Sequence, residues 1–394
     1  MTRPEVFVVG AVRTAIGRFG GTLKEVPLTS LATTAVRGAL EHAGVSPLQV
    51  GHVVMGNVIP TEARDAYLSR VAAIESGIPN TTPAFNVNRL CGSGLQAIIS
   101  GAQSILLGDT EVAVCGGAES MSRSPYLVSA ARWGARMGDS TMVDYMLAVL
   151  HDPFEAIHMG VTAENVAARY GVTREMQDQL AVESQQRASR AIAAGRFKSQ
   201  IVPVEAPVGK GTVRFDTDES VRSDATVDQL SKMKPVFKPG GLVTAGNASG
   251  INDGAAALVL ASGTHVRTAN LKPLARLVAY GHAGVEPAYM GIGPVPATRL
   301  ALERSGLSVA ALDIIESNEA FAAQACAVAR ELDFDPSKVN PNGSGISLGH
   351  PVGATGAVIA TKAIHELHRT GGRYALVTMC IGGGQGIAAI FERV

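Results

Sequence analysis

One stretch of this sequence occurs twice, at an offset of 262 residues. Residues 37–46 read RGALEHAGVS and residues 299–308 read RLALERSGLS. In the first copy the apolar residues share one helical face up to Gly44, which is the pattern of a helix that a glycine ends. A short loop and a strand-like run follow each copy, HVVMGN at 52–57 and DIIESN at 313–318. Such a repeat constrains the fold, because both copies are expected to form the same unit.

A weaker similarity extends this repeat. It pairs VAVCGG at 112–117 with LVTMCIGGG at 376–384. The strand-like runs are almost continuously apolar and helical patterns lie between them, which is typical of buried strands in an α/β protein. We therefore predict two similar βα halves. The alternative, two unrelated helices of common composition, does not explain the ordered second and third matches.

A segment of different composition interrupts this rhythm between residues 121 and 250. It is richer in Arg, Lys, Asp and Met, and it contains an amphipathic helix pattern at 174–194 that Thr173 caps and Gly195 ends. Several prolines then mark a long loop. We interpret it as an inserted lid or ligand-binding domain, after which the strand 255–261 returns to the first half. The predicted parts are residues 1–120 with 251–271, residues 121–250, and residues 272–394.

Length and charge limit the function. A chain of 394 residues can bury a large core in two or three domain-sized units. Its formal net charge is zero, which gives no electrostatic argument for a nucleic acid or a membrane surface as partner. The uncharged stretch 374–391 contains four glycines and a glutamine, so it is expected to form strand, turn and strand and not a membrane span.

The cysteines and the N-terminus indicate the compartment. The four cysteines form no CxxC pair and no metal-ligand spacing, which favours a reducing cytoplasm and no bound metal. Met1 to Glu5 lead directly into the strand-like VFVVG, so we expect no targeting segment.

Two cysteines are candidates for chemistry because a glycine-rich turn follows each of them. Cys91 stands in NRLCGSGLQAI and Cys380 in YALVTMCIGGGQG. A thiol that opens a glycine-led helical segment sits where free backbone N–H groups and the helix dipole favour its thiolate. Cys115 and Cys326 lack such surroundings and are expected to be core residues. His350, between Gly349 and Pro351 on a turn, is a candidate base.

These motifs occur together in one known family, and the chain resembles a thiolase, most closely the bacterial β-ketothiolases that supply polyhydroxyalkanoate synthesis. Five motifs in family order span almost the whole chain: CGSGLQAI at Cys91, AGNASG at 245–250, NEAF at Asn318, GHPVGATGA at His350, and CIGGGQG at Cys380. The resemblance implies a thiolase-like α/β fold, with two duplicated halves in an α/β/α/β/α layering and an inserted loop domain that forms the coenzyme A pocket.

The resemblance also implies roles in a ping-pong Claisen condensation or its reverse, thiolysis. Cys91 would carry the acyl group as a thioester, His350 would remove the Cys91 proton, and Cys380 would remove the α-proton of the incoming acetyl-CoA. The N–H groups of Cys91 and Gly382 would form one oxyanion hole. His350 and a water held by Asn318 would form the second.

Ligand contacts follow from the same resemblance. His158 and Met159 would line the acyl pocket beside Met290, Arg222 would flank the adenine, and Ser249 would contact the pantetheine arm. Where related thiolases often have a serine seven residues after this arginine, the chain has Gln229. The implied ligands are acetyl-CoA and short-chain acyl-CoA thioesters as substrates, with no permanently bound cofactor, and the implied assembly is a homotetramer.

Parts of the sequence also fit three alternatives to a thiolase. The glycine-rich segment after Cys380 could suggest a phosphate loop, but it lacks the following Lys and Ser or Thr and opens no evident helix. An acyl-carrier-protein-dependent ketosynthase of related fold would have a second histidine at Asn318 and no need of Cys380. An inert acyl-CoA-binding or scaffold protein would have lost a catalytic group, whereas Cys91, Asn318, His350 and Cys380 are all present.

Overall fold

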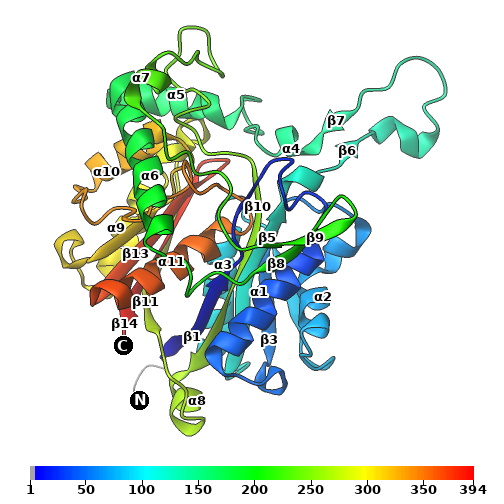
Figure 1. The fold of residues 1–394 in the computed structure, drawn as a ribbon, viewed down its shortest axis with the longest axis vertical. Coiled ribbons are helices and arrows are strands. Elements are labelled where there is room, and N and C mark those ends of the chain that lie inside the picture. The colour runs from blue at the N-terminus through cyan, green and yellow to red at the C-terminus, as the bar shows by residue number, and fades with distance from the viewer. Residues whose placement is uncertain (1–4) are drawn as a thin grey trace.

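The structure, a computed structural model, describes residues 5–394 and has a single large mixed sheet at its centre. Ten strands take part, in the order β12-β13-β14-β11-β1-β10-β5-β3-β4, with β2 paired to β10. Figure 1 shows the strands with helices on both sides. The strands are β1 (Val6–Arg13), β2 (Gly17–Arg18), β3 (His52–Gly56), β4 (Ala84–Val87), β5 (Val112–Ser120), β10 (Asn252–Ser262), β11 (Ala275–Gly284), β12 (Ile314–Ser317), β13 (Tyr374–Ile381) and β14 (Gln385–Arg393).

The sheet consists of two halves that meet at a weak junction. β1 joins β11 through only two residue pairs, Phe7 with Arg276 and Val8 with Ala275. On one side, β1, β10 and β5 are antiparallel and β3 and β4 continue in parallel. On the other side, β11, β14 and β13 are antiparallel and β12 continues in parallel. An isolated bridge from Ile315 to Val339 stands where β4 stands in the first half. The two halves therefore have the same connectivity, as the sequence repeat predicted.

The strand registers give the correspondence residue by residue. Val53 pairs with Val114 in the first half and Ile314 pairs with Ala375 in the second, at the same separation of 61 residues. Because β3 and β12 are the matching strands of the repeat, Cys115 corresponds to Leu376 and not to Cys380. The similarity of VAVCGG to LVTMCIGGG thus found the right two strands, and the register between them comes from the structure, since apolar strands carry little register information.

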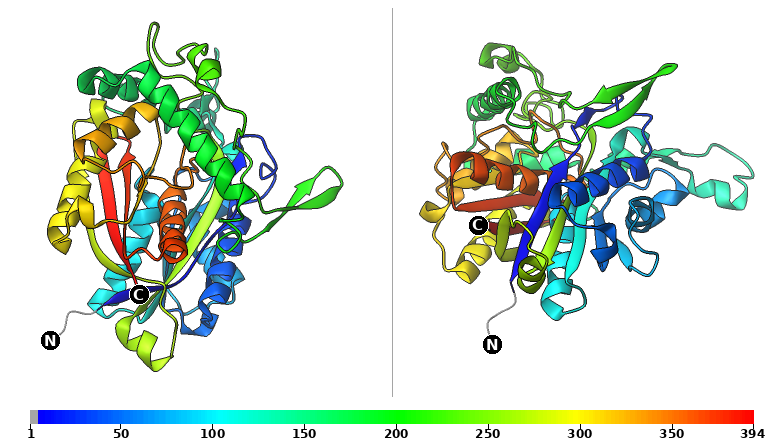
Figure 2. Two further views of the ribbon diagram at one scale, coloured as in Figure 1. Left: turned by 60° about the vertical axis from the view of Figure 1, so that its left-hand side comes forward. Right: turned by 60° about the horizontal axis from the view of Figure 1, so that its bottom comes forward.

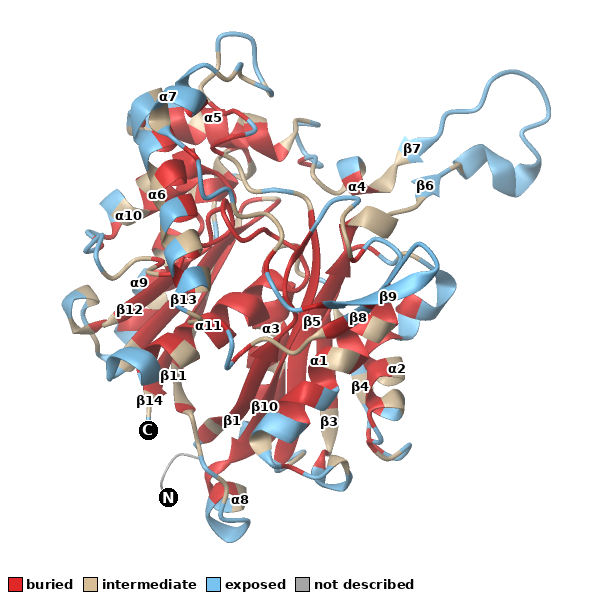
Figure 3. Cartoon of the chain, in the orientation of Figure 1, coloured by how far each residue is buried: buried red, intermediate tan, exposed pale blue. Residues whose placement is uncertain are grey.

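Two helices lie in the centre of the molecule, between the halves of the sheet. α3 (Ser93–Leu107) packs on β5 and β3, α11 (Thr355–Thr370) packs on β13 and β12, and the two helices contact each other. Both are apolar on most faces, which a helix buried between two layers requires. Figure 3 shows that burial is concentrated in this central region.

The outer helices confirm the glycine-ended pattern of the repeat. α1 (Leu28–Ala43) and α2 (Leu68–Glu75) cover the first half, and α9 (Pro294–Ser305) and α10 (Ala322–Glu331) cover the second. α1 ends at Gly44 with φ 64° and α9 ends at Gly306 with φ 69°. Only glycine adopts this left-handed conformation without steric cost, so each helix ends where its sequence copy ends.

The segment between β5 and β10 forms the inserted part. Its long helix α6 begins after Thr173, whose hydroxyl accepts the Met176 N–H, so the predicted helix is confirmed. The helices and strands of the segment are β6 (Tyr126–Leu127), β7 (Val143–Asp144), α4 (Tyr145–Ala148), α5 (Met159–Tyr170), α6 (Arg174–Ala193), β8 (Val204–Val208), β9 (Gly211–Phe215) and α7 (Val227–Ser231). A short helix, α8 (Gly263–Thr268), follows β10.

The insertion is attached to both halves. α5 and α6 pack on α10 of the second half, while the β8–β9 hairpin extends past the first half (Figure 2). Arg13 of β1 binds the two carboxylate oxygens of Asp218 through Nη1 and Nη2 of its guanidinium group, at 2.7 and 2.8 Å, and both side chains are fully buried. An arm from β6 to β7 extends away from the body of the protein (Figure 1).

One stretch of the described residues, Leu90–Leu107, is long and apolar enough to cross a membrane by length and composition. It comprises α3 and the residues just before it, and 61% of it is buried inside the protein. Its apolar character is that of the central helix layer.

Candidate active site

Cys91 lies at the N-terminus of the central helix α3. The chain leaves β4, turns at Leu90 with φ 45°, and begins α3 two residues after the cysteine. The Ser93 hydroxyl donates to the Leu90 carbonyl at 2.6 Å and accepts the Arg89 N–H at 2.8 Å, which holds this turn. The thiol is thereby presented at a helix N-terminus, as the glycine-led pattern predicted.

Cys380 reaches the same place from the other half. It is the second-last residue of β13, and the hairpin to β14 turns through Gly383 with φ 77° and Gly384 with φ 85°. The backbone N–H groups of Gly382 and of Cys91 itself lie close enough to the Cys91 sulfur to lower its pKa. The two N–H groups that the resemblance assigned to an oxyanion hole therefore lie at the same thiol.

Burial controls both thiols. It raises the pKa of Cys91 to about 11, although the Gly382 and Cys91 N–H groups lower it. Burial also raises the pKa of Cys380, and the negative charge of a Cys91 thiolate raises it further. Since each charge opposes the other, the pair does not carry two thiolates at once. Near neutral pH the resting site holds two thiols, and Cys91 needs a base.

His350 lies on a turn two residues before Val352, which belongs to an apolar cluster that Cys91 packs against. Its turn is fixed by Asn252, whose side-chain oxygen accepts the His350 N–H at 2.9 Å and whose amide donates to the Gly17 carbonyl at 3.0 Å. Gly349 has φ 118°, and a Cβ there would lie 2.5 Å from Asn252, so only glycine fits. The lone Gly-His-Pro of the sequence is thus a tightly packed turn.

The His350 ring is buried and neutral. It is 5% exposed, and burial lowers its pKa to about 4, so the imidazole is uncharged at neutral pH. Nδ1 lies 2.7 Å from the Thr355 hydroxyl. Nε2 has no hydrogen-bond partner within residues 5–394. A neutral imidazole with one free nitrogen can accept a proton.

Asn318 follows β12 and is completely buried. Its backbone N–H donates to the Thr378 carbonyl at 3.0 Å, two residues before Cys380. Neither polar atom of its side chain has a partner in the described part of the chain. A buried amide without protein partners is costly, which is typical of a group that binds substrate or water.

The acyl side of the site is apolar. His158 caps α5 by accepting the Gly160 N–H at 3.0 Å, and its ring stacks on Phe237 with centroids 4.6 Å apart. Burial lowers the pKa of His158 to about 4, so it too is neutral. Met159, Met290 and Cys380 belong to one apolar cluster. A narrow cavity opens at Cys91, and it is lined by Val58, Leu90, Cys91, Val149, Leu150, Met159, Val352 and Gly382.

The two residues expected to contact coenzyme A, Ser249 at the pantetheine arm and Arg222 at the adenine, are more exposed than His350 and Asn318. Ser249 is half-buried, and its N–H donates to the Ala320 carbonyl of the NEAF segment at 3.0 Å, beside Asn318. Arg222 is exposed on the loop before α7, and its N–H donates to Gln185 of α6 at 2.7 Å. Gln229, the departure from the family pattern, forms a capping box with Thr226 at the N-terminus of α7.

The sequence reasoning missed Glu119, at the end of β5. Its carboxylate is fully buried and accepts four hydrogen bonds from two segments, residues 57–59 and Gly353. The donors are the Asn57 side chain at 2.8 Å and the N–H groups of Val58 at 3.1 Å, Ile59 at 3.0 Å and Gly353 at 2.8 Å. Burial raises its pKa to about 8, although the three N–H groups lower it. Glu119 thus ties the turn of His350 to the loop beside Cys91. The glutamate after VAVCGGA was a signal, since a charge at the end of an apolar strand needs partners.

Of the remaining cysteines, Cys115 lies in the core as expected, whereas Cys326 is only partly buried against an apolar cluster. Cys115 is fully buried in the core, and burial raises its pKa. Burial raises the pKa of Cys326 to about 12. Among the described residues, no group of three or more His, Cys, Asp or Glu side chains could hold a metal ion.

A partly buried thiol beside two backbone N–H donors, with a second thiol close to it, is the equipment of an enzyme that transfers acyl groups through a thioester. Two family models, for the N-terminal and the C-terminal domain of thiolase, match residues 6–264 and 271–393. The chain belongs to the thiolase family.

Relatives agree over the full length. The chain is 67% identical to beta-ketothiolase BktB of Cupriavidus necator, covering 100% of both chains, and 50% identical to an acetyl-CoA acetyltransferase of Chromobacterium violaceum, covering 99% and 100%. The crystal structure of human mitochondrial 3-ketoacyl-CoA thiolase superimposes with a TM-score of 0.97 at 46% identity over 100% of both chains. These matches confirm the thiolase fold and the acyltransferase activity, a ping-pong condensation of acetyl-CoA with acyl-CoA or its reverse. They exclude the ketosynthase and inert-scaffold alternatives.

Proposed function

We propose that Cys91 is the acyl acceptor of this thiolase. In the first half-reaction its sulfur attacks the thioester carbonyl, Nε2 of His350 takes the thiol proton, and the proton then passes to the departing CoA thiolate. The observation that carries this assignment is the position of the Cys91 and Gly382 N–H groups at the Cys91 sulfur. Donors in that place would stabilise the oxyanion that forms on the acyl group.

Cys380 serves as the second acid and base. While Cys91 carries negative charge, the pKa of Cys380 is raised. Acylation turns Cys91 into a neutral thioester and removes this effect, so Cys380 becomes easier to ionise at the stage where a base is needed. It then takes the α-proton of the second acetyl-CoA, the carbanion attacks the acyl carbonyl on Cys91, and the Cys91 thiolate leaves.

Asn318 and His350 hold the thioester oxygen of the second substrate. The free side chain of Asn318 supports this, because it can hold a bridging water in the buried site. In this stage Nε2 of His350 must carry a proton, which it gains from Cys380 when that thiol ionises and gives to the Cys91 thiolate at the end of the cycle.

His158, Met159 and Met290 line the acyl pocket, and Arg222 and Ser249 contact coenzyme A. The apolar, narrow cavity at Cys91 supports acetyl and short acyl groups as substrates. The N–H of Arg222 is tied to α6, which orients its loop beside the second half. The enzyme needs no permanently bound cofactor, since thiols, histidine and backbone donors supply each step. The ligand-binding segment is residues 121–250, between the half formed by 1–120 with 251–271 and the half formed by 272–394.

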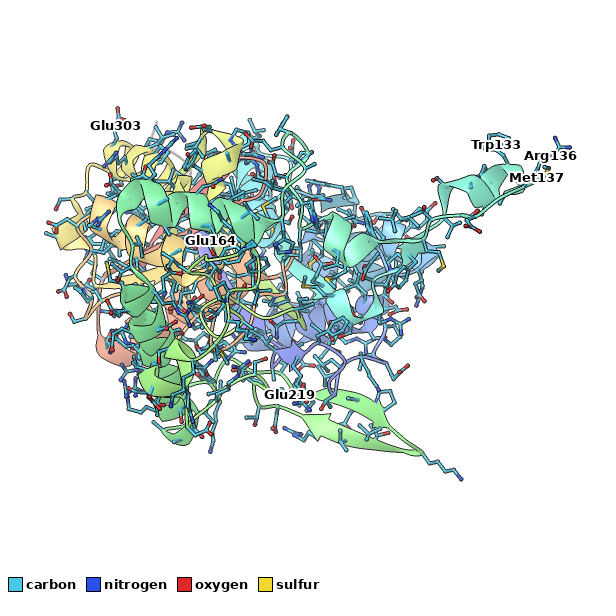
Figure 4. All side chains as sticks on the ribbon, turned by 90° about the horizontal axis from the view of Figure 1, so that it is seen from above. Trp133, Arg136, Met137, Glu164, Glu219 and Glu303 are labelled. Carbon is cyan, nitrogen blue, oxygen red and sulfur yellow. The ribbon has the colours of Figure 1, made fainter. Side chains whose placement is uncertain are left out.

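The enzyme is a cytoplasmic homotetramer. Its four cysteines are unpaired, which supports a reducing compartment. The arm between β6 and β7 supports assembly, because large apolar side chains are exposed there: Trp133 is 84% and Met137 is 95% exposed. Figure 4 shows both at the tip of the arm, far from the body. Apolar side chains held so far out are typical of a surface that a second copy covers.

Intact-protein mass spectrometry tests the roles of the two cysteines. After mixing with acetyl-CoA, Cys380→Ser is expected to carry one acetyl group and Cys91→Ala none, and neither variant should form acetoacetyl-CoA. Serine is too weak an acid to shuttle protons as a thiol does near neutral pH. Cys115→Ala, in the core, is the control and should keep both half-reactions. An adduct on Cys91→Ala with none on Cys380→Ser would reverse the two roles.

A further inference from the structure

The two ring nitrogens of His350 have different surroundings. Nδ1 lies 2.7 Å from the hydroxyl oxygen of Thr355, the first residue of α11. Nε2 is buried without a partner in residues 5–394. Because burial keeps the imidazole neutral, with a pKa of about 4, it carries one hydrogen, and its position decides which nitrogen can act as a base.

The Thr355 hydroxyl has a second neighbour that fixes the direction of this hydrogen bond. Its oxygen lies 2.9 Å from the carbonyl oxygen of Pro351, one helical turn earlier. A carbonyl can only accept, whereas a hydroxyl has one hydrogen to give. If the hydroxyl donates to Pro351, it accepts from Nδ1–H of His350, and two hydrogen bonds form. If it donates to Nδ1, the carbonyl has nothing to accept from it, and only one forms.

The arrangement with two hydrogen bonds is the stable one in a site from which water is excluded. It has one more hydrogen bond than the other arrangement, and two facing oxygens 2.9 Å apart without a hydrogen between them repel each other. This carbonyl also accepts the Ala354 and Thr355 N–H groups, so it is held in place by the first turn of α11.

We propose that Thr355 sets the tautomer of His350: its hydroxyl accepts Nδ1–H and donates to Pro351, which leaves the Nε2 lone pair free to take the Cys91 proton. This positioning role rests on the proposed function. The balance is simple. The proton moves from the Cys91 sulfur to Nε2, the other hydrogen stays bound to Nδ1 and donated to the Thr355 oxygen throughout, and Nε2 passes its proton to the leaving CoA thiolate.

The test compares two variants that differ only by the hydroxyl. Thr355→Ser keeps it and Thr355→Ala removes it, while both lose the methyl group. Thr355→Val is unsuitable, because it would place a methyl group 2.7 Å from Nδ1, a distance that only a hydrogen bond allows. Single-turnover acetylation by acetyl-CoA is followed by intact mass. We expect Thr355→Ala to acetylate at least about 10-fold more slowly, and Thr355→Ser within about 3-fold of the unchanged enzyme, with KM for acetyl-CoA similar in both.

A second measurement needs no variant that might fail to fold. Nitrogen-15 spectra of the histidine-labelled enzyme report the tautomer of each ring, and His350→Asn assigns the signals. We expect the Nδ1–H tautomer for His350. An Nε2–H tautomer, or equal acetylation rates in Thr355→Ala and Thr355→Ser, would overturn the role of Thr355. An unchanged enzyme that forms no acetyl adduct would overturn the proposed function instead.

Discussion

Glu119 and Cys380 occupy the same position in the two halves of the molecule. β3 pairs with β5 in the same register as β12 pairs with β13. When the two strand pairs are aligned by this register, Glu119 falls on Cys380. Each also faces a glycine on the next strand, Gly254 for Glu119 and Gly386 for Cys380. The second half of the duplicated fold thus has the buried thiol of Cys380 at the position where the first half has the carboxylate of Glu119, which binds two loops.

The same correspondence links two asparagines. Asn57 follows β3 and Asn318 follows β12, at matching positions of the repeat. The Asn57 amide donates to Glu119 and to the Ala118 carbonyl, at 2.8 and 3.2 Å, whereas the Asn318 side chain has no partner within residues 5–394. The asparagine of the first half thus holds a loop, whereas the side chain of the asparagine of the second half has no protein partner within the described residues.

This contrast predicts opposite effects of one substitution at two places. Asn318→Ala is expected to lower kcat on the order of 100-fold or more, which corresponds to about 3 kcal/mol for one oxyanion donor, with little change in stability. Asn57→Ala is expected to lower the free energy of unfolding by about 1–3 kcal/mol, because it removes one of the two donors to a buried carboxylate oxygen of Glu119. Steady-state condensation assays and urea unfolding measure the two. Near-normal turnover of Asn318→Ala would contradict the second oxyanion hole.

Glu119→Gln is expected to reduce both stability and the rate of Cys91 acetylation. The amide nitrogen cannot accept, so one side of the group faces N–H donors and loses its two hydrogen bonds, at about 1–3 kcal/mol. One of the lost or strained contacts holds Gly353 in the turn of His350. Glu303→Gln, on the exposed face of α9 (labelled in Figure 4), is the matched control. Equal thermal stability of the two variants would argue against Glu119 as the link between the loops.

The pH dependence of acetylation follows from His350. Burial lowers its pKa to about 4, so the imidazole stays neutral and able to accept a proton as the pH falls through 6.5, where an exposed histidine would become charged. The rate of the first half-reaction is therefore expected to stay nearly constant from about pH 7 to pH 5. Stopped-flow measurement of CoA release gives this profile. A loss of rate centred near pH 6.5 would show that His350 titrates as an exposed group.

Arg222→Ala is expected to raise KM for acetyl-CoA and to leave kcat largely intact, because a contact to the adenine end, remote from the reacting carbon, contributes uniform binding. Lys210→Ala, at the exposed tip of the β8–β9 hairpin, removes the same charge elsewhere on the insertion and serves as control. Initial rates over a range of acetyl-CoA concentrations separate the two constants. An unchanged KM with a collapsed kcat would remove Arg222 from the coenzyme A site.

The arm predicts the assembly. Replacing Trp133 and Met137 by aspartate is expected to convert tetramers into smaller species, because charges would then be buried where apolar side chains pack. Light scattering after size-exclusion chromatography measures the mass. Phe154→Asp, at a side chain that is 72% exposed outside the arm, should leave the mass unchanged. A tetramer that survives both arm substitutions would place its contacts elsewhere.

The sequence by itself determined the duplicated architecture and the chemical groups. The repeat predicted two equal halves, since helices that end at Gly44 and Gly306 are written in local residue patterns. Motifs around Cys91, His350 and Cys380 identified the thiolase family, because turns of glycine and proline beside reactive groups leave a local signature.

Only the tertiary structure decided how these groups act. The strand register makes Glu119 equivalent to Cys380 and Cys115 equivalent to Leu376, and this register depends on hydrogen bonds between strands far apart in the chain. The hydrogen bond of Thr355 to Nδ1 of His350 and the unequal partners of Asn57 and Asn318 are likewise contacts in space. Burial then sets the pKa of each group, and a one-dimensional pattern does not contain burial, because the residues that exclude water come from every part of the chain.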